Sequence, residues 1–205
     1  MKTDFFSLPR MRGRVGERAN RSEKHPLSRP SDTLPRKRGR EEYFERDVRV
    51  IAADLRRRSH RAALVRLLDE YRAGPTGEGK PLDPEVKRRL PGDLSRHPMA
   101  RVYLAVAGKT IAGAATCFLG YSTFQGRPLI NFHDIVVERR FRRRGVATAL
   151  LRKVEEAASE EGCCRLTLEV RADNKAALGL YRRTGFSSGP SPMLFLTKTV
   201  EPCAS

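Results

Sequence analysis

The segment 134–161 constrains the fold of this chain more than any other part. It runs from an apolar strand ending in "DIVV" through an arginine-rich turn, "ERRFRRRG", into a helix whose apolar residues recur on one face. The stripe expected to be buried consists of Ala147, Leu150, Leu151, Val154 and Ala158. A strand and a helix joined this closely must bury their apolar faces against one sheet, so the segment predicts an α/β protein.

The same patterns continue on both sides of this segment. Short connections between the elements predict a mixed sheet of about six to seven strands with helices on both faces. Gly108 marks a tight turn between two of the strands, and Asp83 is the expected N-cap of a short helix. Strands are expected at 48–53, 101–107, 109–121, 129–137, 165–170 and 191–200, and helices at 59–74, 83–95, 145–161 and 173–186.

Residues 1–45 differ from the rest in composition. They are rich in Arg and Pro and too poor in apolar residues to offset the cost of ordering a backbone, so they predict a disordered basic tail before one domain at 46–203. Two alternatives stay open: the tail is an arm for nucleic acid or membranes, or translation starts at Val48 or Val50. Mass spectrometry of the native N-terminus would decide between a translated tail and a later start.

The chain carries a formal charge of +17, which favours anionic ligands but does not determine the fold. Its four cysteines have no metal-ligand spacing, and the sequence shows neither a secretory signal nor an apolar run of membrane-spanning length. We therefore expect reduced thiols, no metal, no membrane partner and a cytoplasmic location. The cysteines are Cys117, Cys163, Cys164 and Cys203.

The arginine-rich turn has the features of an anion site. A helix N-terminus carries unpaired N–H groups and a partial positive charge. Gly145 would let a phosphate approach the backbone, Ala147 keeps the first helical turn low, and Arg142–Arg144 add guanidinium donors. The turn suits a pyrophosphate, but it has neither the GK[ST] of a P-loop nor a full GxGxxG, which argues against ATP and NAD.

Two motifs carry a resemblance to a known family. Arg142-x-x-Gly145-x-Ala147 matches the [QR]-x-x-G-x-[GA] signature of the GNAT superfamily of N-acetyltransferases. The later stretch "NKAALGLYRRTGF" resembles the second motif of that family, an Asn seven residues before a Tyr, closed by Gly-Phe. The order of strands and helices over 46–200 fits the same fold.

The resemblance implies acetyl-CoA as co-substrate. Its pyrophosphate would lie on Arg142, Arg143, Arg144, Gly145, Val146 and Ala147, and its pantetheine arm along Ile135, Val136 and Val137. A main-chain N–H of that strand would polarise the thioester carbonyl. Asn174 would contact the cofactor arm, and Tyr181 would protonate the departing thiolate. Without the resemblance, Asn174 is equally well explained as a helix N-cap and Tyr181 as a core aromatic.

His133 and Asp134 interrupt an otherwise apolar strand. Burying polar side chains there costs free energy, so we expect the pair to have hydrogen-bond partners or a functional role. Strict alternation places His133 on one face with Ile135 and Val137, and Asp134 on the other. His133 is the preferred general base and Asp134 the second candidate. A structural role for either residue is the competing interpretation.

The predicted function is acetyl transfer from acetyl-CoA to a primary amine, by direct attack in a ternary complex. The acceptor stays open among small amines, aminoglycoside-like compounds, amino acids and protein N-termini, and a homodimer is neither required nor excluded. Alternatives are a GNAT-fold module that binds CoA without catalysis and a basic nucleic-acid-binding protein. The latter is disfavoured because the arginine run contains one aromatic, Phe141, and adjoins no recognisable nucleic-acid module.

Overall fold

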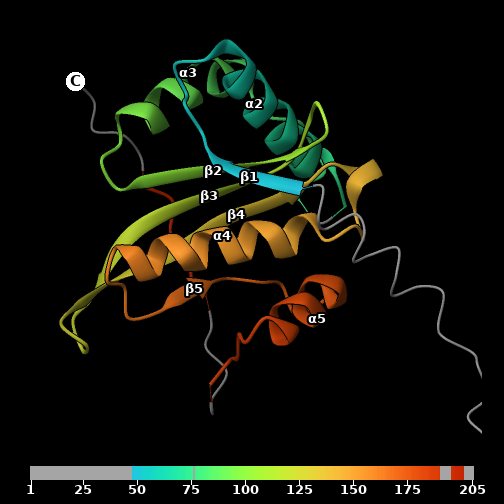
Figure 1. Ribbon diagram of the computed structural model, residues 1–205. Helices are drawn as coiled ribbons and strands as arrows, with labels where there is room; N and C mark the ends of the chain where they lie inside the picture. Colours follow the sequence, from blue (N-terminus) through green and yellow to red (C-terminus); the bar gives the residue numbers. More distant parts are fainter. Residues whose placement is uncertain (1–47, 76, 190–194, 201–205) are drawn as a thin grey trace, which may run out of the picture. The chain divides into compact units, whose positions relative to one another are not determined.

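The computed structural model describes residues 48–75, 77–189 and 195–200. The predicted tail at 1–45 and Cys203 lie outside this part. Within it, one five-stranded sheet has the order β1-β2-β3-β4-β5 (Figure 1). Neighbouring strands are antiparallel except β4 and β5, which are parallel, so the predicted mixed sheet is confirmed. The strands are β1 (Val48–Ala52), β2 (Ala100–Ala107), β3 (Thr110–Ser122), β4 (Arg127–Val137) and β5 (Leu166–Leu168).

Two of the helices begin at side-chain caps that the sequence predicts. Asp83 accepts a hydrogen bond from the N–H of Glu85 at 2.8 Å, and Asn174 accepts one from Ala177 at 3.2 Å. Gly145 lies ahead of its helix with a φ of 76°, a left-handed conformation that glycine adopts without steric cost. The helices are α2 (Arg58–Ala73), α3 (Pro84–Arg96), α4 (Val146–Glu160) and α5 (Lys175–Arg183), with a 3₁₀ turn, η1, at Arg139–Phe141.

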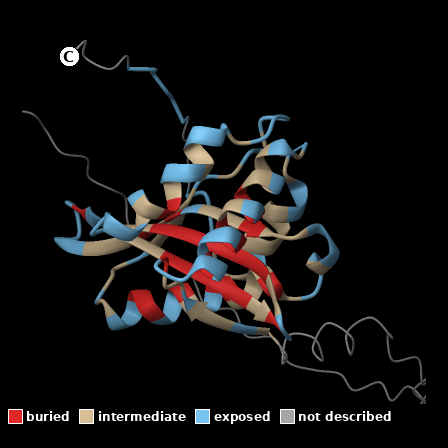
Figure 2. Ribbon diagram, turned by 90° about the horizontal axis from the view of Figure 1, so that it is seen from above, coloured by how far each residue is buried: buried red, intermediate tan, exposed pale blue. Residues whose placement is uncertain are grey.

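Helices cover both faces of the sheet, as predicted. On one face the apolar stripe of α4 packs against Cys117, Ile130 and Phe132, and residues of α5 pack at the edge of this cluster. On the other face, Leu64 and Leu67 of α2 pack against Leu104 and other strand residues (Figure 1). Figure 2 shows that the buried residues concentrate in the central strands and on the helix surfaces turned toward them.

The sheet has fewer strands than the sequence predicts. The expected last strand at 191–200 falls partly outside the described residues, and its described part, 195–200, is irregular. Phe195 and Leu196 there are 75% and 84% exposed. Alternating hydrophobicity shows that a segment is compatible with a strand, but the strand forms only when the backbone of a neighbouring strand supplies hydrogen bonds. Residues 195–200 pair with no strand of the described sheet.

The predicted face of His133 is wrong, whereas Asp134 lies on the face opposite Ile135 and Val137, as predicted. Along β4, Asp134 pairs with Thr116 of β3 whereas Phe132 pairs with the next residue, Cys117. His133 is therefore an extra residue in β4, a β-bulge. The bulge shifts the alternation by one position, so His133 no longer shares a face with Ile135 and Val137 and instead lines the same pocket as Asp134.

The described residues also bear on the predictions about membranes, metals and cysteines. No helix among them is long and apolar enough to cross a membrane. No group of His, Cys, Asp or Glu side chains in the same part could hold a metal ion. Cys117, Cys163 and Cys164 are free thiols there, and burial raises the pKa of the Cys117 thiol to about 12.

Candidate functional site

β4 and β5 separate partway along the sheet. β5 pairs with β4 only over Ile130–Phe132, opposite Leu166–Leu168. From Asp134 to Val137, β4 continues as a partner of β3, while the side toward β5 has no strand pairing among the described residues. One edge of β4 is therefore open just where the bulge begins.

The hydrogen-bond pattern shows which groups face this open edge. The N–H of Glu138 donates to the carbonyl of Ala112 in β3 at 2.9 Å. Because backbone groups alternate along a strand, the N–H groups of Ile135 and Val137 point the opposite way, into the gap. Consistently, the Val137 carbonyl accepts a hydrogen bond from Arg142 Nε at 3.1 Å, from outside the sheet.

The arginine-rich turn closes the end of this gap. Arg143 and Gly145 both have positive φ, 61° and 76°, and helix α4 starts at Val146. The carbonyl of Gly145 accepts from Ala149 at 2.9 Å, as the first bond of the helix. The N–H groups of the first turn, Val146 to Thr148, have no carbonyl a turn earlier to bond, so they are available to donate to an anion.

The arginines of the turn are not equivalent. Arg140 pairs with Glu138, and its guanidinium lies 4.9 Å from the centre of the Phe141 ring. Arg144 lies 6.0 Å from the same ring, and Arg142 is held by the Val137 carbonyl. Helix α2 fixes the turn from the other side, since Arg66 pairs with Glu138 at 2.9 Å. Arg140 and Arg144 thus both lie against the Phe141 ring, whereas Arg142 bonds the end of β4.

Tyr181 lies on α5 and packs against the same apolar cluster as Ile135 and Val137 of β4. Its ring packs edge-to-face against Phe186 at 5.8 Å, and Phe186 packs against Phe132 of β4 at 6.2 Å. Burial raises the pKa of the Tyr181 phenol, and the neighbouring phenol of Tyr71 adds to the rise. Tyr181 therefore stays protonated through neutral pH. Asn174 caps α5, as one of its two sequence interpretations predicts.

A pocket of about 690 Å³ lies on the opposite face of the sheet, between α2, α3 and the strands β3 and β4. His133 and Asp134 both line it. Burial raises the pKa of Asp134, and His133 opposes that rise. Thr116, opposite Asp134 in the ladder, is 3% exposed, and its hydroxyl has no hydrogen-bond partner within the described part of the chain.

A family model described as the acetyltransferase (GNAT) family matches residues 61–186. The chain belongs to this family. The match covers α2 to α5 and both motifs, so it confirms the resemblance read from the sequence. It also supports the acetyltransferase class that the sequence predicts.

Known relatives agree with the family. Thialysine N-epsilon-acetyltransferase of Bos taurus is 36% identical over 78 residues, 38% of this chain and 45% of that protein, so the match spans less than half of the relative. A crystal structure of a probable acetyltransferase is 24% identical, with a TM-score of 0.61, and covers 77% of this chain and 99% of its own. AAC(6')-Iy in complex with the bisubstrate analogue CoA-S-monomethyl-acetylneamine is 15% identical, with a TM-score of 0.60, covering 74% and 99%. At these identities the two solved structures show a shared fold.

Of the residues that line the larger pocket in this GNAT-family chain, sequence reasoning proposed only His133 and Asp134 as site residues. Thr116 and Phe118 come from β3, Tyr71 from α2, and Arg171 from the segment after β5. Thr116 and Phe118 sit in a strand pattern that signals only a core, and Tyr71 continues the apolar stripe of α2. No local signal distinguished these residues, because the pocket is assembled by tertiary contacts.

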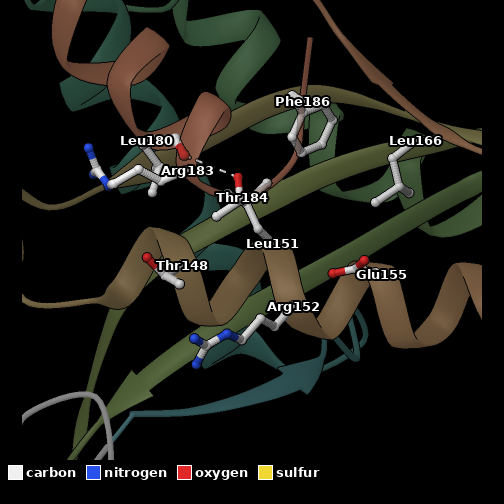
Figure 3. Close-up of a pocket in the computed structure, with 9 residues that line it drawn as sticks. All are labelled: Thr148, Leu151, Arg152, Glu155, Leu166, Leu180, Arg183, Thr184 and Phe186. Atoms are coloured by element: carbon white, nitrogen blue, oxygen red, sulfur yellow. Dashed lines mark hydrogen bonds between the residues drawn. The ribbon is translucent and has the colours of Figure 1, made fainter. Parts of the chain in front are cut away.

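A second pocket, of about 340 Å³, lies between α4 and α5 (Figure 3). Thr148, Leu151 and Arg152 of α4 line one side, and Leu180 and Thr184 line the other. The Thr184 hydroxyl donates to the Leu180 carbonyl at 3.2 Å, which satisfies the end of α5. Phe186, which closes the second motif, lines this pocket, whereas Asn174, Tyr181 and the glycine turn do not.

Proposed function

We propose that this GNAT-family chain transfers the acetyl group of acetyl-CoA to a primary amine in a ternary complex. The observation that carries the proposal is the bulge at His133. It lies where β4 and β5 separate, with outward N–H groups at Ile135 and Val137 on the open edge and Asp134 on the face that lines the pocket. A thioester carbonyl at the edge and an amine in the pocket would then meet at β4.

The cofactor would follow the open edge of β4. Its pantetheine amides can pair with main-chain groups of Ile135–Val137 as an added strand would. Its pyrophosphate would take the first-turn N–H groups of Val146 and Ala147, with Arg142–Arg144 around it. Asn174 uses its side-chain oxygen as the cap of α5, so its amide N–H₂ is the group that would reach the pantetheine arm.

The reaction is a direct acyl transfer. The amine nitrogen attacks the thioester carbonyl carbon, the new C–N bond forms, and the negative charge gathers on the carbonyl oxygen. An N–H of Ile135 or Val137 stabilises that charge. When the C–S bond breaks, the sulfur takes the electron pair and Tyr181 donates its phenolic proton to it. A phenol with pKa about 10 or higher can protonate a thiolate whose conjugate acid has pKa about 8.5 when water is excluded.

The amine must lose a proton before or during attack. His133 and Asp134 both line the pocket, so the bulge makes the pair, rather than His133 alone, the proton acceptor in this proposal. The raised pKa of Asp134 makes its carboxylate a stronger base than an ordinary aspartate. His133, which is exposed and stacks edge-to-face on Phe118 at 5.6 Å, would pass the proton to solvent.

Two relatives support the reaction class. One is described as acting on the ε-nitrogen of thialysine, and the other binds an analogue that joins CoA to an acetylated amine. A bisubstrate analogue mimics a state in which both substrates are bound together, which favours a ternary complex over an acetylated enzyme in the present chain too.

The test is free thiol release from acetyl-CoA in the presence of a panel of primary amines, together with thermal unfolding with and without acetyl-CoA. We expect a saturable rise in melting temperature with acetyl-CoA and amine-dependent thiol release. A thermal shift without turnover of any amine would point to the CoA-binding module instead. No shift and no turnover would remove acetyl-CoA from the proposal.

A further inference from the structure

The pocket beside Asp134 has a wall made mainly of apolar side chains. They come from α2, from the segment before α3 and from one face of α3, and they are closed off by an aromatic ring of β3. These residues are Leu68, Tyr71, Leu82, Val86, Leu90, Leu94 and Phe118. Such a wall lowers the free energy of an apolar ligand and raises that of any charged group placed against it.

Most of the charged groups that line the pocket are held in ion pairs. Glu78 pairs with Arg72 at 2.6 Å, and Arg171 pairs with Asp173 at 2.7 Å. Among the described residues that line the pocket, Asp134 is the one carboxylate without an ion pair. The pocket therefore offers a place for one ammonium group, and neither a second anionic site nor a free guanidinium for a carboxylate.

The polar end is built around an unsatisfied hydroxyl. Thr116 and Asp134 face each other across the β3–β4 ladder, and the buried Thr116 hydroxyl lacks a partner in the described chain. A buried polar atom without a hydrogen bond is costly, and a ligand that supplies one removes that cost. A neutral primary amine between Thr116 and Asp134 could donate one N–H to each side-chain oxygen. Its lone pair would then remain available to attack the thioester carbonyl carbon.

We infer that the acceptor is a monoamine with an apolar body, such as an arylalkylamine, rather than a polyamine, an aminoglycoside or a free amino acid. This inference rests on the proposed function and names its substrate class. The amine lies between Thr116 and Asp134, and the body lies along the leucines of α3. A second ammonium group, or several hydroxyls, would lie against Leu90 and Leu94 without partners.

The inference is tested on the full chain with acetyl-CoA and four acceptors: 2-phenylethylamine, spermidine, thialysine and kanamycin. Free thiol release gives kcat/KM for each. We expect 2-phenylethylamine to exceed each of the others by about 100-fold, because groups that lose water without gaining partners are strongly rejected. A higher kcat/KM for spermidine, thialysine or kanamycin overturns the substrate class and leaves the acetyltransferase function standing.

A substitution in the apolar wall of the pocket provides an independent test. Leu94→Asp puts a carboxylate on the apolar wall, and we expect it to lower kcat/KM for 2-phenylethylamine by about tenfold and to raise that for spermidine. The control, Ser95→Asp, adds the same charge at the next residue of α3, which is exposed and outside the pocket. It should leave both values unchanged.

The outcomes distinguish an error in the inferred substrate class from an error in the proposed function. Thermal unfolding and the KM for acetyl-CoA show whether Leu94→Asp is folded, and if it is not, the wild-type panel decides alone. Equal effects of the two variants would overturn the placement of the acceptor body against α3. Failure of every amine to release thiol would overturn the proposed function, and the inferred substrate class with it.

Discussion

The two sides of β4 differ in how their functional groups are brought together. On the open edge, the main-chain groups of Ile135 and Val137, the glycine turn and Tyr181 come from β4 and the two motifs, within one continuous stretch, 135–186. On the pocket side, Tyr71, Leu94, Thr116 and Asp134 come from four elements distant in sequence. A short motif can encode the first arrangement, whereas the second depends on the whole fold. Chemistry shared within a family would therefore reside at the edge, and substrate choice in the pocket.

The largest effect should come from the edge. Tyr181→Phe removes the proposed proton donor to the thiolate, and we expect kcat to fall by about 100-fold or more, with the KM for acetyl-CoA nearly unchanged. The matched control is Tyr121→Phe, a tyrosine that is 64% exposed. Steady-state thiol release measures both variants. A wild-type kcat for Tyr181→Phe would leave Tyr181 as a core aromatic and remove catalysis from this part of the edge.

The glycine turn should separate binding from chemistry. Gly145→Glu places a side chain and a negative charge where the pyrophosphate belongs, so we expect the KM for acetyl-CoA to rise by more than about tenfold. Strain at positive φ is controlled by Gly162→Glu, since Gly162 has a φ of 68° at the exposed end of α4. If both variants raise KM alike, the effect comes from the helix rather than from the anion site.

A substitution on the pocket side should change the kinetics of the amine and not those of acetyl-CoA. Thr116→Val keeps the shape of the side chain and removes its hydroxyl, so we expect the KM for the amine to rise about fivefold while the KM for acetyl-CoA stays constant. The melting temperature should hold or rise slightly, because a buried unsatisfied group is lost. A drop in melting temperature with an unchanged amine KM would show that Thr116 has a structural partner instead.

Sequence predictability follows the same division. Gly145, Asn174 and the stripe of α4 carry local signals, through a turn, a cap and a period, and the structure places these elements where the sequence predicts. The orientation of His133 could not be predicted, because the bulge is set by how β4 pairs with β3 and leaves no mark on β4 itself. The described part of the strand expected at 191–200 is irregular for a related reason, since the sequence pattern says nothing about an available edge. Thr116 was missed because a threonine in a strand is ordinary until its neighbours are known.

The smallest expected effect concerns the free energy of keeping Asp134 charged in the pocket. Because burial raises the pKa of this carboxyl above its ordinary 3.8, the folded state binds a proton more tightly than the unfolded state does. The wild type should therefore lose stability as pH rises from about 3.8 through the raised pKa, and stay level above it. Asp134→Asn lacks this loss, so its melting temperature should exceed that of the wild type by a few degrees at pH 7 and converge with it in acid.

Melting curves from pH 4 to pH 8 give the comparison directly, and Asp173→Asn is the control. The Arg171 guanidinium lowers the pKa of Asp173 below its ordinary 3.8, so the stabilisation from this carboxylate is complete above about pH 4 and Asp173→Asn should lower the melting temperature by the same amount across this range. If Asp134→Asn instead destabilises the protein at neutral pH, the carboxylate is already satisfied by the fold. In that case the polar end of the pocket is a structural element and the amine must bind elsewhere. If the predicted signs hold, the pocket keeps an unpaired carboxylate at a cost in stability, which is what a binding site for a single ammonium group requires.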